Sequence, residues 1–280
     1  MTRTIEREIQ ECAAEAGASE IAVAVDDMPD GRTLRLNAER WFHAASTIKL
    51  AVLLALYDAI ERGELPGDAR VHVRNQFTSL VDGRYYRVDP SREAAEAVHG
   101  YIGRTMRVRD LARHMIVTSS NLATNALVEL LGPEAIRASL DRAGIEGVEF
   151  RRGVEDERAW EAGLNNRVTA AGLAGLLRRI ADEDAVSESS SQEMLDILHD
   201  QRFVSGIPAG LPDGARVANK TGEISTVVHD AGVVYLPDRD PYVVVVLTEW
   251  EGNGETGERR KLIADVSRLV VEEFVAPSHG

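Results

Sequence analysis

Apolar residues recur at helical spacing through the middle of the chain, whereas short β-rich runs occur only near its two ends. The opening helical stripe stops at Gly17, and the Asp30-Gly31 turn separates the first two β-rich runs. The predicted strands are 21–25, 32–36, 216–218, 231–236 and 242–248. The predicted helices are 3–16, 46–62, 109–118, 122–131, 133–143, 169–181, 192–199 and 259–274.

This order of elements predicts an α+β fold in which the two ends of the chain build one antiparallel sheet. The terminal helices would flank this sheet. Residues 1–43 and 199–280 are therefore predicted to form a discontinuous sheet domain. Residues 44–198 would form an inserted all-helical domain.

Charge and composition narrow the function classes. The chain of 280 residues has 46 acidic and 32 basic side chains, for a formal net charge of -14. Such a surface repels nucleic acid and anionic lipid, so we expect no nucleic-acid partner. The single cysteine, Cys12, lies in an apolar helical stripe and allows no internal disulfide. No partner protein is implied.

No segment predicts a membrane anchor. The longest apolar runs, 50–56 and 243–247, are far shorter than the ~20 residues that span a bilayer. The first residues are charged and lack the apolar core of a signal peptide. The sequence as written predicts a cytoplasmic protein, or a secreted or periplasmic one if an upstream signal was removed.

Ser46 and Lys49 form the first motif with chemical potential. They lie three residues apart at a predicted helix start, so they share one face. A neutral lysine amine can act as the base that turns a serine hydroxyl into a nucleophile. The alternative is that Ser46 or Thr47 only caps the helix and that Lys49 is solvated.

Two further motifs follow. Ser119-Ser120-Asn121 stands at a helix boundary, where a hydroxyl and an amide can line a cleft or simply cap the next helix. Lys220-Thr221-Gly222 follows a β-rich run, where an edge strand can present a cation and let a ligand approach the backbone. The alternative there is a strand end with a turn glycine.

Taken together, the three motifs resemble the Ser-x-x-Lys, Ser-x-Asn and Lys-Thr-Gly set of the penicillin-recognising serine enzymes, in the same order. Residues 161–165, Glu-Ala-Gly-Leu-Asn, resemble the Glu-x-x-Leu-Asn segment of class A β-lactamases. The resemblance covers most of residues 43–265 and implies a β-lactamase fold.

The resemblance implies an acyl-enzyme route to hydrolysis of a β-lactam. Ser46 would attack the amide carbonyl, with Lys49, or Glu161 through a water, as the base. Ser119 would pass a proton to the leaving nitrogen. Glu161 and Asn165 would position the hydrolytic water.

The implied substrate-binding residues come from the same motifs and from the closing helix. Lys220 and Thr221 would hold the substrate carboxylate, and the backbone N–H groups of Ser46 and Glu223 would form the oxyanion hole. The full implied set is Asn121, Asn165, Lys220, Thr221, Gly222, Glu223 and Arg260. The partner would be a small-molecule β-lactam or acyl-peptide.

Several features depart from the class A pattern. The loop after Asn165 is short, Ser120 replaces a usual Asp, and Glu223 replaces a usual small or neutral residue. Glu155 and Asp156 compete with Glu161 for the role of base. The alternatives are a D-alanyl peptidase or esterase of the same superfamily, or a penicillin-binding sensor without turnover.

Other chemistry is not indicated. His229-Asp230 invites comparison with a Ser–His–Asp triad, but Lys49 already supplies a base, so a structural role is favoured. The seven histidines show no metal-ligand spacing, so the sequence predicts neither a metal nor a cofactor.

Overall fold

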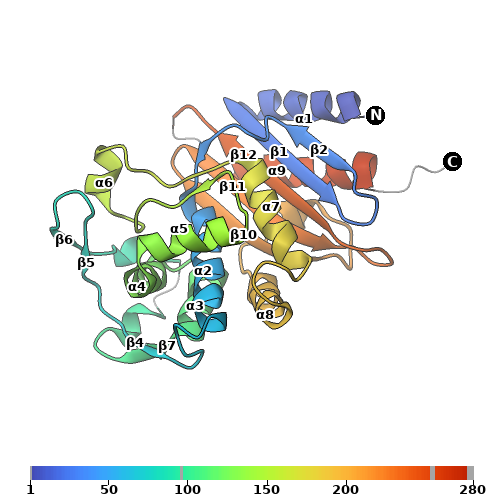
Figure 1. The fold of residues 1–280 in the computed structure, drawn as a ribbon. Coiled ribbons are helices and arrows are strands. Elements are labelled where there is room, and N and C mark those ends of the chain that lie inside the picture. Colours follow the sequence, from blue (N-terminus) through green and yellow to red (C-terminus); the bar gives the residue numbers. More distant parts are fainter. Residues whose placement is uncertain (1, 95–96, 253–255, 276–280) are drawn as a thin grey trace.

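A five-stranded antiparallel sheet organises the computed structural model, which describes residues 2–94, 97–252 and 256–275 (Figure 1). Its strand order is β10-β11-β12-β1-β2, so strands from both ends of the chain lie side by side. The strands are β1 (Glu20–Asp27), β2 (Thr33–Leu36), β10 (Arg216–Ile224), β11 (Val227–Tyr235) and β12 (Tyr242–Glu249).

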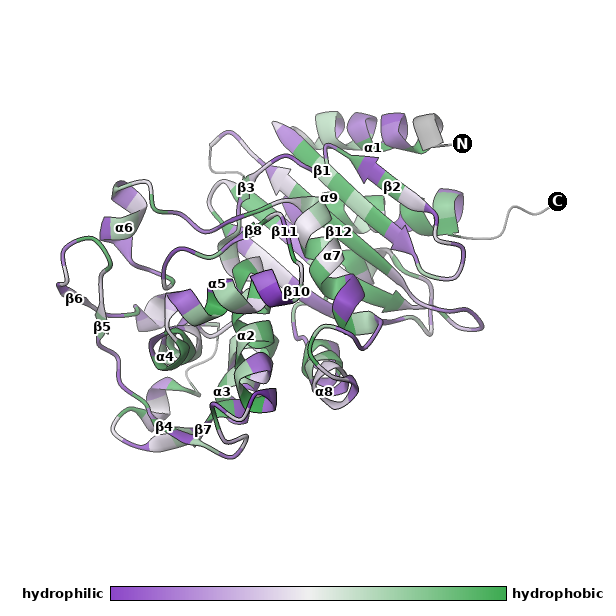
Figure 2. Cartoon of the chain, in the orientation of Figure 1, coloured by the Kyte–Doolittle hydropathy of each residue, from purple (hydrophilic) through white to green (hydrophobic). Residues whose placement is uncertain are grey.

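Side chains on both faces of the central strands are buried, which explains their nearly continuous apolar sequence. Val23 of β1, for example, pairs with Val246 of β12 on one side and with Leu36 of β2 on the other. Figure 2 shows these strands as the most hydrophobic part of the sheet. β10 has only one neighbour, so its other edge is free to form one wall of a site.

Helices cover both faces of the sheet. The terminal helices α1 and α9 pack on one face through Ile5, Ile9 and Leu262. Helices α7 and α8 contact the strands from the opposite side, and α2 to α5 extend the molecule beyond them (Figure 1). The helices are α1 (Thr2–Ala16), α2 (Lys49–Glu61), α3 (Val108–Val117), α4 (Asn121–Leu131), α5 (Pro133–Arg142), α6 (Glu157–Glu161), α7 (Ala170–Ala181), α8 (Glu188–His199) and α9 (Thr256–Leu269).

Short elements complete the chain. A π-helical turn, Val270–Val275, follows α9. The short strands are β3 (Phe42–His43), β4 (Arg70–His72), β5 (Phe77–Thr78), β6 (Tyr85–Tyr86), β7 (Thr105–Arg107), β8 (Val148–Glu149) and β9 (Arg167–Val168). The 3-10 turns are Ala45–Ile48, Pro90–Arg92, His99–Tyr101 and Ile207–Gly210.

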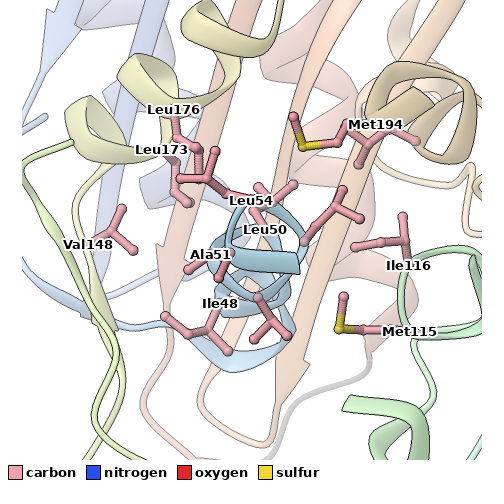
Figure 3. Packing of buried hydrophobic residues seen from close by; sticks show 14 of the residues in the cluster. Ile48, Leu50, Ala51, Leu54, Met115, Ile116, Val148, Leu173, Leu176 and Met194 are labelled. Carbon is pink, nitrogen blue, oxygen red and sulfur yellow. The ribbon is translucent and has the colours of Figure 1, made fainter. Parts of the chain in front are cut away.

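Helix α2 is the centre of the larger apolar core. Every side chain from Leu50 to Tyr57 is buried, as expected of a helix that is apolar all round. Figure 3 shows Leu50 and Leu54 of α2 among residues from α3, α7 and α8, including Met115 and Leu173. This packing fixes the position and direction of α2, the helix that directly follows the turn with Ser46.

The α+β class predicted from the sequence is confirmed, since strands from both ends of the chain form one antiparallel sheet with the terminal helices packed on it. Several elements differ in extent from the prediction: α8 begins at Glu188 instead of 192, and β11 begins at Val227 instead of 231. β10 continues to Ile224, so the Lys-Thr-Gly motif lies within the strand. The predicted helix from Ser46 begins as the 3-10 turn Ala45–Ile48. The two-domain division stays a prediction, and one apolar core draws residues from both predicted segments.

Among the described helices, none is long and apolar enough to cross a membrane.

Leu54→Ala tests how far the fold depends on the packing around α2. Leu54 is fully buried, and deleting its side chain leaves a cavity that surrounding helices fill only in part. We expect the free energy of unfolding to fall by about 2–5 kcal/mol, measured by urea denaturation. The control Leu130→Ala removes a leucine that is 40% exposed and should change it by less than about 1 kcal/mol. Equal losses would show that α2 is not the centre of the core.

Candidate active site

Ser46 lies in the tight turn that leads into α2. The preceding residue, Ala45, has a φ of 44°, a left-handed conformation that is unusual for a residue with a side chain. Thr47 turns its hydroxyl back to the carbonyl oxygen of Ala44 at 2.6 Å, and no side chain caps α2. The structure therefore does not assign Ser46 or Thr47 the role of a helix cap.

Lys49, one turn further on, is fully buried. Its Nζ donates to the carbonyl oxygen of Ser119 at 2.7 Å, to Ser119 Oγ at 3.1 Å and to Asn121 Oδ1 at 2.7 Å. Burial lowers the pKa of Lys49 to about 7, against the upward pull of the Glu93 and Glu155 carboxylates. These three bonds use every donor of an ammonium. All three acceptors belong to the Ser119-Ser120-Asn121 motif.

Ser119 is hydrogen-bonded to two lysine side chains. Its Oγ accepts from Lys49 and, at 3.0 Å, from Lys220 Nζ. Ser119 has a φ of 54°, which again marks a constrained backbone. Ser120 is the N-cap of α4 and accepts from the Ala123 N–H at 3.1 Å. The capping role considered for this motif thus falls to Ser120, while Ser119 and Asn121 face the lysines.

Lys220 is the buried cation of the edge strand β10. Its Nζ also donates to the carbonyl oxygen of Thr221 at 2.8 Å. Burial, and then repulsion by Lys49, lowers the pKa of Lys220 well below its usual value, while Asp230 acts in the opposite direction. Gly222 lies against the nucleophile turn: a Cβ there would stand 3.0 Å from the Thr47 backbone nitrogen. A side chain at this position would push the strand away from Ser46.

Glu155 is the carboxylate that the structure connects to these motifs. Its Oε1 accepts from Asn121 Nδ2 at 2.7 Å, and its Oε2 accepts from the Asp89 N–H at 2.9 Å. Asn121 thus bridges Glu155 and Lys49. Glu155 has a φ of 59°, so the chain adopts a strained conformation where this carboxylate enters the site.

Glu161 and Asn165 are placed differently from each other. Glu161 is exposed and lines the cavity beside Ser46; within the described part of the chain its carboxylate makes neither an ion pair nor a hydrogen bond. Asn165 Oδ1 accepts from Arg152 Nη2 at 3.1 Å. The neighbouring Asn166 lines the cavity, but its side chain bonds to the backbone of residues 151 and 152.

Glu223 and Arg260 are paired with each other. Arg260 Nη2 and Nε donate to Glu223 Oε2 at 2.6 and 3.1 Å. Both residues line a cavity beside Ser46. The Arg260 guanidinium, which the resemblance places among the substrate-binding groups, therefore already has a carboxylate partner.

Two cavities meet at Ser46, and most of the site residues described above line one or both of them. The larger has a volume of about 430 Å³ and includes Asn121, Glu155 and Glu161 in its lining. The smaller, of about 280 Å³, includes Ser119, Thr221 and Gly222. Eight of the eleven predicted site residues thus line one of these cavities, Ser46, Glu223 and Arg260 among them. Lys49 and Lys220 lie beneath, bonded to Ser119.

His229 takes no part in this network. Its Nδ1 accepts from the Thr248 N–H at 3.2 Å, so Nε2 carries the proton and donates to the carbonyl oxygen of His43 at 2.9 Å. Both ring nitrogens are therefore bound to backbone. Within residues 2–94, 97–252 and 256–275, no three His, Cys, Asp or Glu side chains are grouped to hold a metal ion.

Two residues beside Lys49 carry little sequence signal. Glu155 belongs to no motif and was a rival candidate only because it lies close to Glu161 in the chain. Glu93 belongs to the stretch 75–105, whose pattern predicts no element, yet its Oε1 accepts from the Leu122 N–H at 2.7 Å.

A serine at a helix start, a buried lysine one turn away, a second serine and an edge-strand lysine define a serine enzyme of the penicillin-recognising type. The chain belongs to the beta-lactamase enzyme family, whose model matches residues 4–274.

Individual relatives agree with this assignment. A β-lactamase of Bacillus licheniformis is 26% identical over 259 residues, covering 88% of this chain and 76% of the relative. The structure of an ancestral class A β-lactamase is similar at a TM-score of 0.83 and 29% identity, covering 96% of this chain and 100% of that one. A Leu-to-Glu mutant of PBP-A, solved as an acyl-enzyme complex with penicillin G, is similar at a TM-score of 0.82 and 25% identity, covering 98% and 97%. The chain is thus an enzyme of the serine β-lactamase type.

The charge state of Lys49 can be measured directly because the chain has three lysines, at positions 49, 220 and 261. With ¹³C-labelled lysine, the Cε resonance of Lys49 should titrate with a midpoint near pH 7, since burial lowers its pKa to about 7. Lys49→Arg assigns the signal by removing it. A midpoint above pH 9 would show that the amine is not desolvated as the structure indicates.

Proposed function

We propose that this enzyme hydrolyses β-lactams through a covalent ester on Ser46. The observation that carries the proposal is the convergence of two buried lysines, Lys49 and Lys220, on one hydroxyl, Ser119 Oγ, next to Ser46. Membership of the β-lactamase family supports a β-lactam substrate. The individual steps below are assigned from the site.

In the first step, Ser46 Oγ attacks the lactam carbonyl carbon and its proton passes to a base. Lys49 in its neutral form suits this role because its pKa of about 7 leaves a substantial fraction unprotonated at neutral pH. The developing oxyanion would accept hydrogen bonds from the backbone N–H groups of Ser46 and Glu223. Both groups border the same cavities.

In the second step, the lactam C–N bond breaks and the nitrogen takes a proton. Ser119 Oγ accepts from both Lys49 and Lys220, so its own O–H remains to donate to the leaving nitrogen. A lysine ammonium can then return a proton to Ser119. Lys220, with Thr221, would also attract the substrate carboxylate at the edge of β10.

Hydrolysis of the ester requires a carboxylate that removes a proton from water. The sequence pattern assigns this role to Glu161, but the contacts favour Glu155, which bonds to Asn121 and so adjoins Lys49. A water beside Glu155 would attack the ester carbonyl, its proton would pass to the carboxylate, and Ser46 Oγ would leave with a proton. Glu161 lines the same cavity at an exposed position.

A second candidate is a penicillin-binding enzyme that acylates but deacylates slowly. The similarity to a PBP-A acyl-enzyme supports it, as does the bond that turns Asn165 toward Arg152. Acylation at Ser46 is common to both candidates, whereas the fate of the ester separates them.

Ser46→Ala should abolish both penicillin turnover and covalent labelling by penicillin or a fluorophosphonate, because it removes the proposed nucleophile, whereas Ser119, the hydroxyl bonded to both lysines, is assigned to proton transfer. Intact mass spectrometry measures the labelling. The control Ser189→Ala, at an exposed position in α8, should behave like the parent. Labelling that persists in the Ser46 variant would remove Ser46 from the mechanism.

Glu155→Gln and Glu161→Gln form a matched pair, since both remove one carboxylate from the same cavity. We expect Glu155→Gln to acylate at Ser46 but to lose deacylation by about 10²–10⁴-fold, so that a penicillin adduct accumulates in the intact mass. Glu161→Gln should turn over within about threefold of the parent. The reverse outcome would assign the base to Glu161. A stable adduct in the parent itself would favour the penicillin-binding candidate.

A further inference from the structure

Glu93 brings a carboxylate to the site from a segment outside all the motifs. It follows the 3-10 turn Pro90–Arg92, and its Oε1 accepts from the Leu122 N–H in the first turn of α4 at 2.7 Å. Its Oε2 is buried and accepts no hydrogen bond from the residues that the structure describes. Leu122 directly follows Asn121, which accepts from Lys49, so the carboxylate lies close to the lysine.

The first turn of α4 otherwise has no acidic side chain. Ser120 caps the helix with a neutral hydroxyl at the position where class A enzymes usually have Asp. A carboxylate bonded to a helix N-terminus is stabilised by the exposed N–H groups and the helix dipole. Glu93 therefore supplies, from another part of the chain, a negative charge that the Ser-x-Asn motif itself lacks here.

We propose that Glu93 is a positioning residue for catalysis: bonded to the Leu122 N–H at the start of α4, next to the Asn121 that accepts from Lys49, it supplies a fixed negative charge beside the Lys49 amine. The proposal rests on the proposed function only for the role of Lys49 as the base. Glu93 lines neither of the two cavities at Ser46.

The charges that face Lys49 come from three directions. Glu93 and Glu155 are negative and raise its pKa, with Glu93 the stronger of the two. Lys220 on β10 is positive and is itself opposed by Asp230 of β11. Loss of either carboxylate therefore leaves two buried amines with less compensation. Glu93 differs from Glu155 because it makes no bond to Asn121 and so can be changed without touching the proposed hydrolytic base.

Polar contacts hold segment 88–93 against the residues that surround the site. The Asp89 N–H donates to Glu155, and Arg92 Nη1 lies 3.2 Å from Glu157 Oε1. Glu93→Gln keeps an oxygen that can accept from Leu122 but removes the charge. Glu93→Asp keeps the charge but shortens the side chain. The pair separates an electrostatic role from a purely structural one.

The experiment follows the ¹³Cε signals of Lys49 and Lys220 against pH in the full chain, without substrate. In Glu93→Gln we expect the Lys49 midpoint to fall by about one pH unit, because the ammonium loses an attractive charge. The acidic limb of the acylation rate should move down by the same amount, while deacylation remains. Glu93→Asp should keep the midpoint within about 0.3 units of the parent.

Glu134→Gln is the control, since it removes a carboxylate whose side chain is 83% exposed on α5, and it should move neither signal. An unchanged Lys49 midpoint in Glu93→Gln, or an equal shift in Glu134→Gln, would overturn the proposal. The NMR titration needs no turnover, so it reports on Glu93 even if penicillin is not hydrolysed. Failure of the parent to acylate would instead count against the proposed function.

Discussion

Two amines buried against one hydroxyl are the constraint on which the site depends. Lys49 and Lys220 are both fully buried and both donate to Ser119 Oγ. Burial lowers the pKa of both amines, and repulsion by Lys49 lowers the pKa of Lys220 further. The site can hold them only because Asn121, backbone carbonyls and a few carboxylates surround them. The same burial lowers the pKa of Lys49 to about 7, so that a fraction of the amine is neutral at neutral pH.

The fold satisfies this constraint with three rigid parts that meet at one point. α2 is fixed by apolar contacts on every side, so its first turn cannot shift without opening the core. β10 is held on one edge by its ladder to β11 and approaches the nucleophile turn at Gly222, where a Cβ would stand 3.0 Å from the Thr47 backbone nitrogen. Ser119 completes the group by adopting a left-handed backbone conformation before α4. Packing energy far from the site thus maintains strained geometry within it.

Much of this arrangement could be predicted from the sequence because it depends on local patterns. The apolar run that follows Ser46 predicts a buried helix, and the restriction of β-rich runs to the two ends of the chain predicts that these ends pair. The spacing of Ser46 and Lys49 follows from helix geometry alone. Lys220 was predicted to follow a strand that ends at Ala218, whereas β10 continues to Ile224 and carries Lys220 within it.

The carboxylates were harder to predict, since their positions depend on loop conformation. Glu161 stands in a segment that resembles a known motif, yet the short connection through Asn166 and β9 leaves it on an exposed helical turn. Glu155 reaches Asn121 only because its own backbone is left-handed, which no neighbouring residue type indicates. Glu93 comes from a stretch without periodicity and acts across 29 residues of sequence on Leu122.

These differences share one physical reason. Nucleophile and lysines must occupy fixed positions relative to backbone N–H groups and to one another, so they lie on regular elements whose sequence pattern is visible. A carboxylate acts over several ångströms through its charge, and many loop paths can deliver it. The chain can therefore shorten one loop and replace the acidic residue of a motif by Ser120, provided that another segment restores the negative charge around Lys49. Glu155 and Glu93 bring carboxylates toward Lys49 from two different loops, one bonded to Asn121 and the other to the N–H of Leu122.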